Sequence, residues 1–157
     1  MSLSFRLGGP ADAGNVRGIV MAAYAKWVPV IGREPMPMRA DYDLALRKHR
    51  FDLAIEDGAI VGLIETILHD DHLFIENVAV RPEAQGRGVG RALLARAEEI
   101  ARLADRGELR LLTNAAFADN VAIYHKHGYG IERQEPFMGG TTLYFSKRRQ
   151  RQCPLDI

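Results

Sequence analysis

The stretch VAVRPEAQGRGVGRALL, from Val78 to Leu94, decides how this chain folds. A run of apolar and β-branched residues ends at Val80, and Pro82 then blocks strand pairing. Three glycines alternate with other residues over positions 86–90, and an amphipathic helix pattern begins at once. Such a turn leaves several backbone N–H groups without internal partners, beside the positive end of the helix dipole. The stretch therefore predicts a binding site for a phosphate group.

Two arginines in the same stretch can add to this site. Arg87 and Arg91 are four residues apart, so they lie on one helical face and can donate charge-assisted hydrogen bonds to phosphate. The alternative is a tight glycine turn with two solvated arginine side chains. Under the first interpretation, the chain handles a phosphorylated cofactor.

Length and composition indicate a single globular domain over residues 1–157, with a basic tail from about Lys147. Hydrophobic residues make up 47% and charged residues 26% of the chain, and the formal net charge is +1. This balance does not favour nucleic acid or a membrane surface as a partner. The single cysteine, Cys153, excludes an internal disulfide framework and a multi-cysteine metal site, and no metal ligand spacing is seen elsewhere. No apolar run approaches the ~20 residues of a membrane span and no signal pattern is present, so we expect a cytoplasmic protein.

Hydrophobic periodicity predicts an alternation of strands and helices along the chain. The expected strands are Ser4–Leu7, Phe51–Glu56, Ala59–Leu68, Leu73–Val80, Leu109–Thr113, Tyr129–Gln134 and Thr141–Ser146. The expected helices run from near Asp12 to Trp27, from Asp41 over a short stretch, over Gly88–Ala104 and over Asp119–His127. Hairpins join strands in the first half of the chain, and helical crossovers join strands in the second half. The fold class is thus α+β, an α/β/α sandwich with a mixed, largely antiparallel sheet of about seven strands and about four helices.

This order of elements, with the glycine loop after the fourth strand, resembles the GNAT superfamily of acyl-CoA-dependent N-acyltransferases. The resemblance covers nearly the whole chain. Its centre is the sequence QGRGVG at 85–90, which fits the pyrophosphate signature of that family. The downstream segment NVAIYHKHGY at 120–129 resembles the family's helix with Asn, Ala and Tyr, followed by Gly and an aromatic residue. The loop is not a Rossmann fingerprint, because its strand belongs to an antiparallel hairpin, and no Gly-Lys-Ser/Thr of a Walker loop follows.

The resemblance implies that the chain binds acetyl-CoA and that the sheet splays open at the fourth strand. The main chain of Val78, Ala79 and Val80 would then pair with the pantetheine arm of the cofactor, chiefly through Val78 and Val80. The pyrophosphate would lie on the loop and the first helical turn. These cofactor-binding residues are Gln85, Gly86, Arg87, Gly88, Val89, Gly90 and Arg91.

Asn120 and Tyr124 are one helical turn apart and share a face. The resemblance places Asn120 near the pantetheine and the Tyr124 hydroxyl near the thioester sulfur, where a phenol can donate a proton to the leaving thiolate. The alternatives are that Asn120 only caps a helix and that Tyr124 is a core aromatic.

Glu76 is the candidate general base that deprotonates the acceptor amine, directly or through water. Strand alternation predicts that its side chain shares a face with Phe74 and Val78, and a carboxylate among apolar neighbours needs a partner or a task. A hydrogen-bonded structural carboxylate at the opening of the sheet is the equal alternative.

The acceptor pocket is expected from the early part of the chain, where aromatic residues and methionines gather. Candidate lining residues are Tyr24, Trp27, Met36, Met38 and Tyr42, together with Glu76. Trp27 is also a candidate for simple packing. The loop over residues 136–139 would close the other side of the pocket.

The leading hypothesis is an N-acetyltransferase that moves acetyl from acetyl-CoA to a primary amine by direct attack in a ternary complex, with a small-molecule acceptor favoured. The rivals are an acyltransferase that uses another acyl-CoA, an oxygen acceptor or a protein amine, and a non-catalytic acyl-CoA sensor or interaction module. Homodimers are common in the family, although the sequence specifies no interface.

Overall fold

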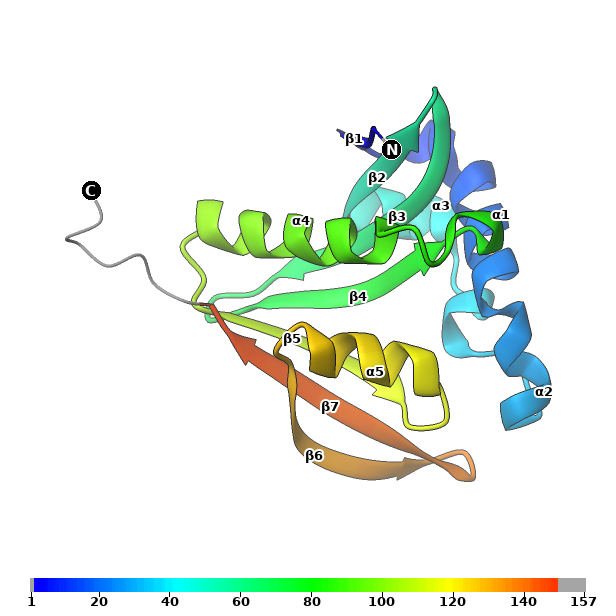
Figure 1. Cartoon of the computed structure of the whole chain (residues 1–157), viewed down its shortest axis with the longest axis vertical. Helices are drawn as coiled ribbons and strands as arrows, with labels where there is room; N and C mark the ends of the chain where they lie inside the picture. Colours follow the sequence, from blue (N-terminus) through cyan, green and yellow to red (C-terminus); the bar gives the residue numbers. More distant parts are fainter. Residues whose placement is uncertain (1, 150–157) are drawn as a thin grey trace.

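A computed structural model describes residues 2–149 of the chain (Figure 1). The strands in this range are β1 (Ser4–Leu7), β2 (Arg50–Glu56), β3 (Ala59–Leu68), β4 (Leu73–Val80), β5 (Glu108–Asn114), β6 (Gly130–Phe137) and β7 (Gly140–Arg148). The α-helices are α1 (Ala13–Tyr24), α2 (Val28–Ile31), α3 (Tyr42–Lys48), α4 (Val89–Leu103) and α5 (Ala118–Lys126). Short 3₁₀ turns are η1 (Pro10–Asp12), η2 (Ala25–Trp27), η3 (Met36–Arg39) and η4 (Pro82–Ala84).

The seven strands form one sheet in the order β1-β2-β3-β4-β5-β7-β6. Every neighbouring pair is antiparallel except β4 and β5, which run parallel because α4 crosses over between them. The fold class predicted from the sequence is confirmed, including the mixed, largely antiparallel sheet.

The sheet is open in its middle. β4 pairs with β5 only from Leu73 to Ile75, opposite Leu109 to Leu111. Beyond Ile75 the two strands diverge, and Figure 1 shows the wedge between them. The expected splay at the fourth strand is confirmed, and the second half of β4 has a hydrogen-bonding neighbour on its β3 side alone within the described residues.

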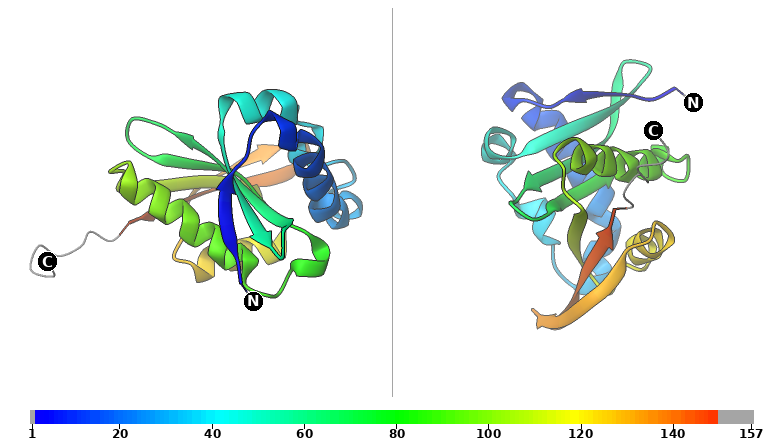
Figure 2. Two further views of the ribbon diagram at one scale, coloured as in Figure 1. Left: turned by 90° about the horizontal axis from the view of Figure 1, so that it is seen from above. Right: turned by 90° about the vertical axis from the view of Figure 1, so that its left-hand side faces the viewer.

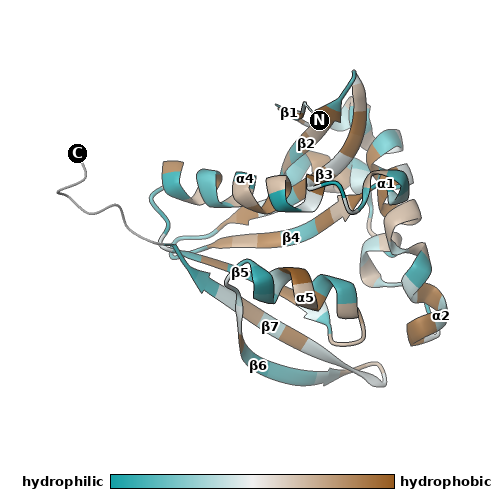
Figure 3. Ribbon diagram, in the orientation of Figure 1, coloured by the Kyte–Doolittle hydropathy of each residue, from teal (hydrophilic) through white to brown (hydrophobic). Residues whose placement is uncertain are grey.

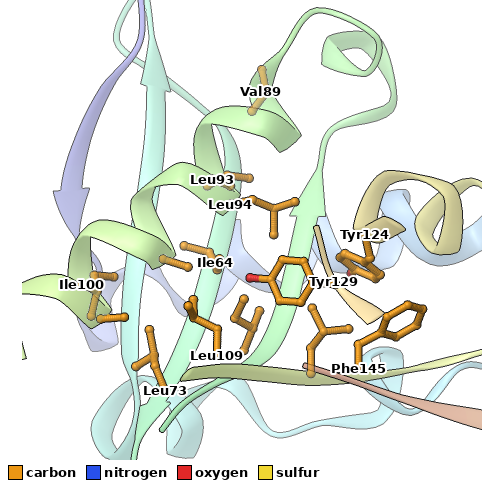
Figure 4. Packing of buried hydrophobic residues seen from close by; sticks show 14 of the residues in the cluster. Ile64, Leu73, Val89, Leu93, Leu94, Ile100, Leu109, Tyr124, Tyr129 and Phe145 are labelled. Atoms are coloured by element: carbon orange, nitrogen blue, oxygen red, sulfur yellow. The ribbon is translucent and has the colours of Figure 1, made fainter. Parts of the chain in front are cut away.

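Helices cover both faces of the sheet (Figures 1 and 2). On one face, α4 and α5 pack on a buried cluster that contains Ile64, Leu109 and Phe145 (Figure 4). On the other face, α1 and α3 pack on a second cluster that contains Phe51 and Leu63. The two clusters give the molecule its three layers.

Helix α4 is strongly amphipathic, with a hydrophilic outer surface in Figure 3. Its predicted core stripe is buried, at Val89, Leu93, Ala97, Ile100 and Ala101. The helix start lies close to the sheet because Gly62 of β3 has no side chain. A Cβ atom there would lie 3.0 Å from the Ala79 carbonyl and 3.1 Å from Val89. A side chain at position 62 would therefore push the first turn of α4 away from β3 and β4.

A β-bulge in β4 corrects one sequence prediction. Glu65 pairs with Asn77 and Thr66 pairs with Ile75, so Glu76 is an extra residue without a partner on β3. The bulge places Glu76 and Asn77 on the α1 and α3 side, whereas Val78 packs with the cluster under α4. The expectation that Glu76 and Val78 share a face is therefore wrong, because simple alternation does not survive a bulge.

The remaining elements follow the sequence closely. Asp57 and Gly58 form the expected hairpin turn, with φ angles of 50° and 80°. β7 extends through Arg148, so the first residues of the predicted basic tail are strand residues. Arg149 hydrogen-bonds to Gly107 and Arg106, while residues 150–157, including Cys153, lie outside the described range. Within residues 2–149, no helix combines the length and apolar character that a membrane crossing requires.

Candidate functional site

The glycine loop between β4 and α4 has the geometry of an anion cradle. Gly86 and Gly88 have φ angles of 77° and 88°, a region in which a side chain is strained. The backbone N–H groups of residues 86–91 have no hydrogen-bond acceptor in the described chain. A Cβ atom built on Gly86, Gly88 or Gly90 would meet nothing within 4 Å, so the surface of the loop is uncrowded at the start of α4, where unpaired amides can receive an anion.

A cleft of about 280 Å³, here called the loop cleft, lies between this loop, the second half of β4 and α5. Of the predicted cofactor residues, it is lined by Val78, Ala79, Val80, Gln85, Gly86, Gly90, Asn120 and Tyr124. The sequence therefore identified two separate segments that the fold brings to one cleft. Their role toward a cofactor stays a prediction.

The other predicted loop residues do not line the loop cleft. Arg87 donates to Glu56 of β2 at 2.8 Å, which ties the loop to the β2–β3 hairpin. The side chain of Val89 is buried in the core, and Gly88 and Arg91 are not among the lining residues. These positions contribute backbone conformation and N–H groups at the helix start.

Lys26 of η2 also lines the loop cleft, a position that was not predicted. Its Nζ atom lies 3.5 Å from Gln85 Oε1 and 3.4 Å from Asp119 Oδ2, and 4.9 Å from the centre of the Trp27 ring. A single lysine in a short turn belongs to no recognisable sequence motif. Its position opposite the glycine loop is therefore seen only in the folded chain.

Tyr124 lies at the inner end of the loop cleft, one turn of α5 after Asn120. Its ring packs against Tyr129 and Phe145, with ring centres 6.1 Å and 5.8 Å away (Figure 4). Burial raises the pKa of the Tyr124 phenol to about 12, so this group keeps its proton at neutral pH.

A second cavity of about 570 Å³, here called the large cavity, opens on the α1 and α3 side of the sheet. Its lining comes from β3, β4 and β5, from residues 31–49 and from the β6–β7 hairpin. Three residues line both spaces: Tyr24, Val78 and Tyr124. The loop cleft and the large cavity therefore meet at the point where β4 leaves β5.

Asn77 of β4 connects the sheet to the helices on one face through hydrogen bonds to two tyrosines. The Tyr24 hydroxyl donates to Asn77 Oδ1 at 3.0 Å, and Asn77 Nδ2 donates to the Tyr42 oxygen at 3.0 Å. The Tyr42 hydroxyl in turn donates to the Pro37 carbonyl at 2.7 Å. This buried chain joins α1, β4 and α3, and it leaves the rings of Tyr24 and Tyr42 as fixed walls of the large cavity.

Glu76 is exposed to the large cavity from the bulge of β4, near the buried Glu65 of β3 and the half-buried His49 that follows α3. In that pair, His49 Nδ1 lies 2.6 Å from Glu65 Oε2. Desolvation raises the pKa of Glu76, and the nearby His49 opposes that shift. Desolvation also raises the pKa of Glu65, against the hydrogen bond from His49. A carboxylate with a raised pKa is a stronger base, which suits Glu76 to accept a proton.

Trp27 does not line the large cavity, contrary to its expected place in the acceptor pocket. Its ring stacks on Phe117, with centres 4.9 Å apart, and it lines the loop cleft instead. Met36 lines the large cavity, whereas Met38 is buried in the core. Of the loop over residues 136–139, Phe137 alone reaches the cavity lining.

Comparison with known proteins places this geometry in context. Residues 19–129 match the sequence model of the "Acetyltransferase (GNAT) family". The uncharacterized protein YxbD of Bacillus subtilis is 33% identical over 78 residues, which are 50% of this chain and 48% of YxbD. The IAA acetyltransferase of Azospirillum brasilense is 33% identical over 82 residues, which are 51% of this chain and 54% of that protein. The chain thus spans about half the length of the curated relatives it matches.

The fold has solved counterparts. The PaiA N-acetyltransferase of Thermoplasma acidophilum, determined in complex with coenzyme A, superimposes with a TM-score of 0.80. It is 18% identical, and the match covers 94% of this chain and 99% of that one. At this identity the likeness concerns the fold.

Proposed function

The chain belongs to the GNAT acetyltransferase family, and on this premise we propose that it transfers acetyl from acetyl-CoA to the primary amine of a small molecule. One observation carries the proposal. A cleft lined by unpaired main-chain groups and a cavity that contains carboxylates meet at Tyr24, Val78 and Tyr124. A donor and an acceptor held in these two spaces would contact each other at this junction.

The residues of the loop cleft suit the cofactor. The N–H groups of residues 86–91 would hold the pyrophosphate, and Lys26 would add a positive charge on the opposite side. The edge of β4 at Val78 and Val80 would pair with the amide groups of the pantetheine arm. The bound cofactor supplies an activated acetyl thioester, which is the chemistry that the protein's side chains lack.

Glu76 is the proposed base. A primary amine is protonated at neutral pH and must lose a proton before it can attack. Glu76 faces the large cavity, and its raised pKa makes it a better proton acceptor than an ordinary carboxylate. His49 and Glu65 lie beside it and can hold or pass on the proton.

Tyr124 is the proposed acid. Its phenol is protonated at neutral pH, because burial raises its pKa to about 12, and it lines both spaces. It can therefore donate a hydrogen bond or a proton where negative charge develops on the leaving group. Holding the two reactants together supplies a further part of the rate.

The proposal is tested by measuring binding and turnover separately. Calorimetry with acetyl-CoA should give a one-to-one complex, and release of free thiol should depend on an added primary amine. Binding without amine-dependent thiol release, across a panel of small amines and peptides, would point to an acyl-CoA sensor. Release with peptides alone would make a protein amine the acceptor.

A further inference from the structure

The large cavity carries opposite charges on different walls. Glu65 and Glu76 come from the sheet, on β3 and β4. Arg33 comes from the segment between α2 and η3, and its guanidinium carbon lies 5.5 Å from the centre of the Phe137 ring at the β6–β7 turn. Arg39, Asp41 and Lys48 also line the cavity and are exposed to solvent, whereas Arg33 is half-buried. The cavity therefore has carboxylates on its sheet wall, next to the proposed reaction centre, and Arg33 as its half-buried cation on the opposite wall.

The Arg33 guanidinium is only partly used by the protein. Its Nη1 atom donates to the Glu34 carbonyl at 3.3 Å. Its Nε atom is buried and has no hydrogen-bond partner among residues 2–149. A buried charged donor without an acceptor is costly, and a carboxylate is the group that matches the planar guanidinium fork best. Arg33 lines the cavity, so an anion there can accept from the Nη end of the guanidinium, while the buried Nε keeps the charge poorly solvated.

The space between the charged walls is largely apolar. Met36 and Leu44 line the cavity, and 51% and 47% of their surfaces, respectively, are exposed. Ile31, Phe137 and the buried Phe117 are among the other apolar residues that line it. Such a surface favours a ligand with an apolar body between its charged ends.

We propose, resting on the acetyltransferase function above, that the acceptor is an amino acid with an apolar side chain. Its ammonium group lies toward Glu76 and Glu65, and its carboxylate accepts hydrogen bonds from Arg33. The reaction forms an amide bond at the nitrogen and breaks the thioester bond. The ammonium group loses two protons: Glu76 accepts one before attack, and the second replaces the proton that Tyr124 donates to the leaving thiolate, so that the thiol is released.

The test compares matched acceptors that differ only in the anionic group. Apolar amino acids are assayed beside their decarboxylated amines, their methyl esters and the corresponding aminophosphonates, with thiol release as the readout. The amino acid should exceed the amine and the ester in kcat/KM by about 10- to 100-fold. Equal or greater rates with the decarboxylated amine would overturn the proposal, and a preference for the aminophosphonate would replace the carboxylate by a phosphonate-type group.

Arg33→Gln should remove this preference. It should lower kcat/KM for the amino acid by about 10- to 100-fold and leave the rate with the decarboxylated amine within about twofold. Arg33→Lys, which keeps the charge and loses the planar fork, should restore part of the preference. Arg47→Gln is the matched control, because Arg47 is exposed on α3 and lines neither space. An equal loss with both acceptors would mean a structural role for Arg33 and would contradict the inference.

Calorimetry with acetyl-CoA separates this inference from the proposed function. If acetyl-CoA binds and small amines release thiol without regard to a carboxylate, the inference fails and the function stands. If acetyl-CoA does not bind and no amine releases thiol, the function itself fails.

Discussion

The loop cleft and the large cavity are built in different ways. The loop cleft depends largely on main-chain groups, namely the amides of residues 86–91 and the free edge of β4, to which Lys26 and Asn120 add polar side chains. The large cavity depends on side chains, since Glu76, Arg33 and the tyrosines define its charge and shape. If acetyl-CoA occupies the loop cleft as proposed, a main-chain surface suits this one ligand, and the side chains of the large cavity would select the acceptor.

This contrast predicts different effects for mutations in the two spaces. Changes in the loop cleft should alter acetyl-CoA binding and leave acceptor choice intact, and changes in the large cavity should do the reverse. Residues at the junction should alter the rate without altering either binding step.

Tyr124→Phe should give the largest effect, because this residue lines both spaces. Loss of the phenol removes the proposed acid, so kcat should fall by about 100-fold or more. Acetyl-CoA affinity, measured by calorimetry, should change by no more than about twofold. A turnover number within about twofold of the parent would exclude the acid role.

Tyr129→Phe is the matched control for that experiment. The Tyr129 ring packs beside Tyr124, and its buried hydroxyl has no hydrogen-bond partner in the described range (Figure 4). Removing an unsatisfied group should leave kcat unchanged and raise the free energy of unfolding by up to about 1 kcal/mol.

Glu76→Gln should lower kcat/KM by about 10- to 100-fold, since the amide cannot accept the proton. In the parent protein, activity should fall as the pH falls through the pKa of Glu76, because the protonated carboxyl is no base. Desolvation raises that pKa, so this acidic limb should lie above the ordinary glutamate value of about 4.3. The variant should lack the limb, and Asp43→Asn, at an exposed site on α3, should retain it. A parent-like pH profile in Glu76→Gln would remove Glu76 as the base.

Gly88→Ala should weaken acetyl-CoA binding by about tenfold. Its φ angle of 88° disfavours a side chain by about 1–2 kcal/mol, so the loop should shift its amides. Gly58→Ala carries a similar strain at φ 80° in the β2–β3 turn, away from both spaces. It should lose comparable stability in urea unfolding and bind acetyl-CoA normally. Equal weakening in both variants would indicate a global effect instead of a cradle.

Lys26→Met should give the smallest effect, a two- to fivefold loss of acetyl-CoA affinity, because the ammonium group is partly exposed and screened. Calorimetry at two salt concentrations should find a weaker salt dependence than in the parent. Lys48→Met, in the large cavity, should leave acetyl-CoA affinity unchanged. A reversed result for these two lysines would break the division between the two spaces.

The same contrast explains what could be predicted from the sequence. The glycine loop and the end of β4 could be located, because the glycine spacing, Pro82 and the start of α4 are all local features. The face on which Glu76 lies could not, since a bulge is a property of pairing between β3 and β4 and leaves no mark in β4 alone. Asn77 did leave a signal, a buried amide within an apolar strand, and its hydrogen bonds to two tyrosines explain it.

Arg33 and Lys26 had no signal at all. Lys26 lies in the 3₁₀ turn η2 and Arg33 in the segment between α2 and η3, two places where charged residues are ordinarily solvated. They matter for the site because the fold brings each of them close to a residue far away in sequence. Arg33 lies over the ring of Phe137, and Lys26 lies beside Gln85. Trp27 shows the opposite case, where an aromatic residue that suited a pocket serves mainly to stack on Phe117.

The three residue pairs between β4 and β5 are the only strand pairing that joins the two halves of the sheet within the described residues. A ligand that hydrogen-bonds along β4 and also contacts α5 would act as a substitute strand in the gap between β4 and β5. Because such a ligand binds only the folded protein, binding stabilises the fold. The melting temperature should therefore rise with ligand concentration. Amide hydrogen exchange should slow in β4 and in β5 together when a ligand is bound. Exchange in the sheet therefore measures how much of the protein is occupied.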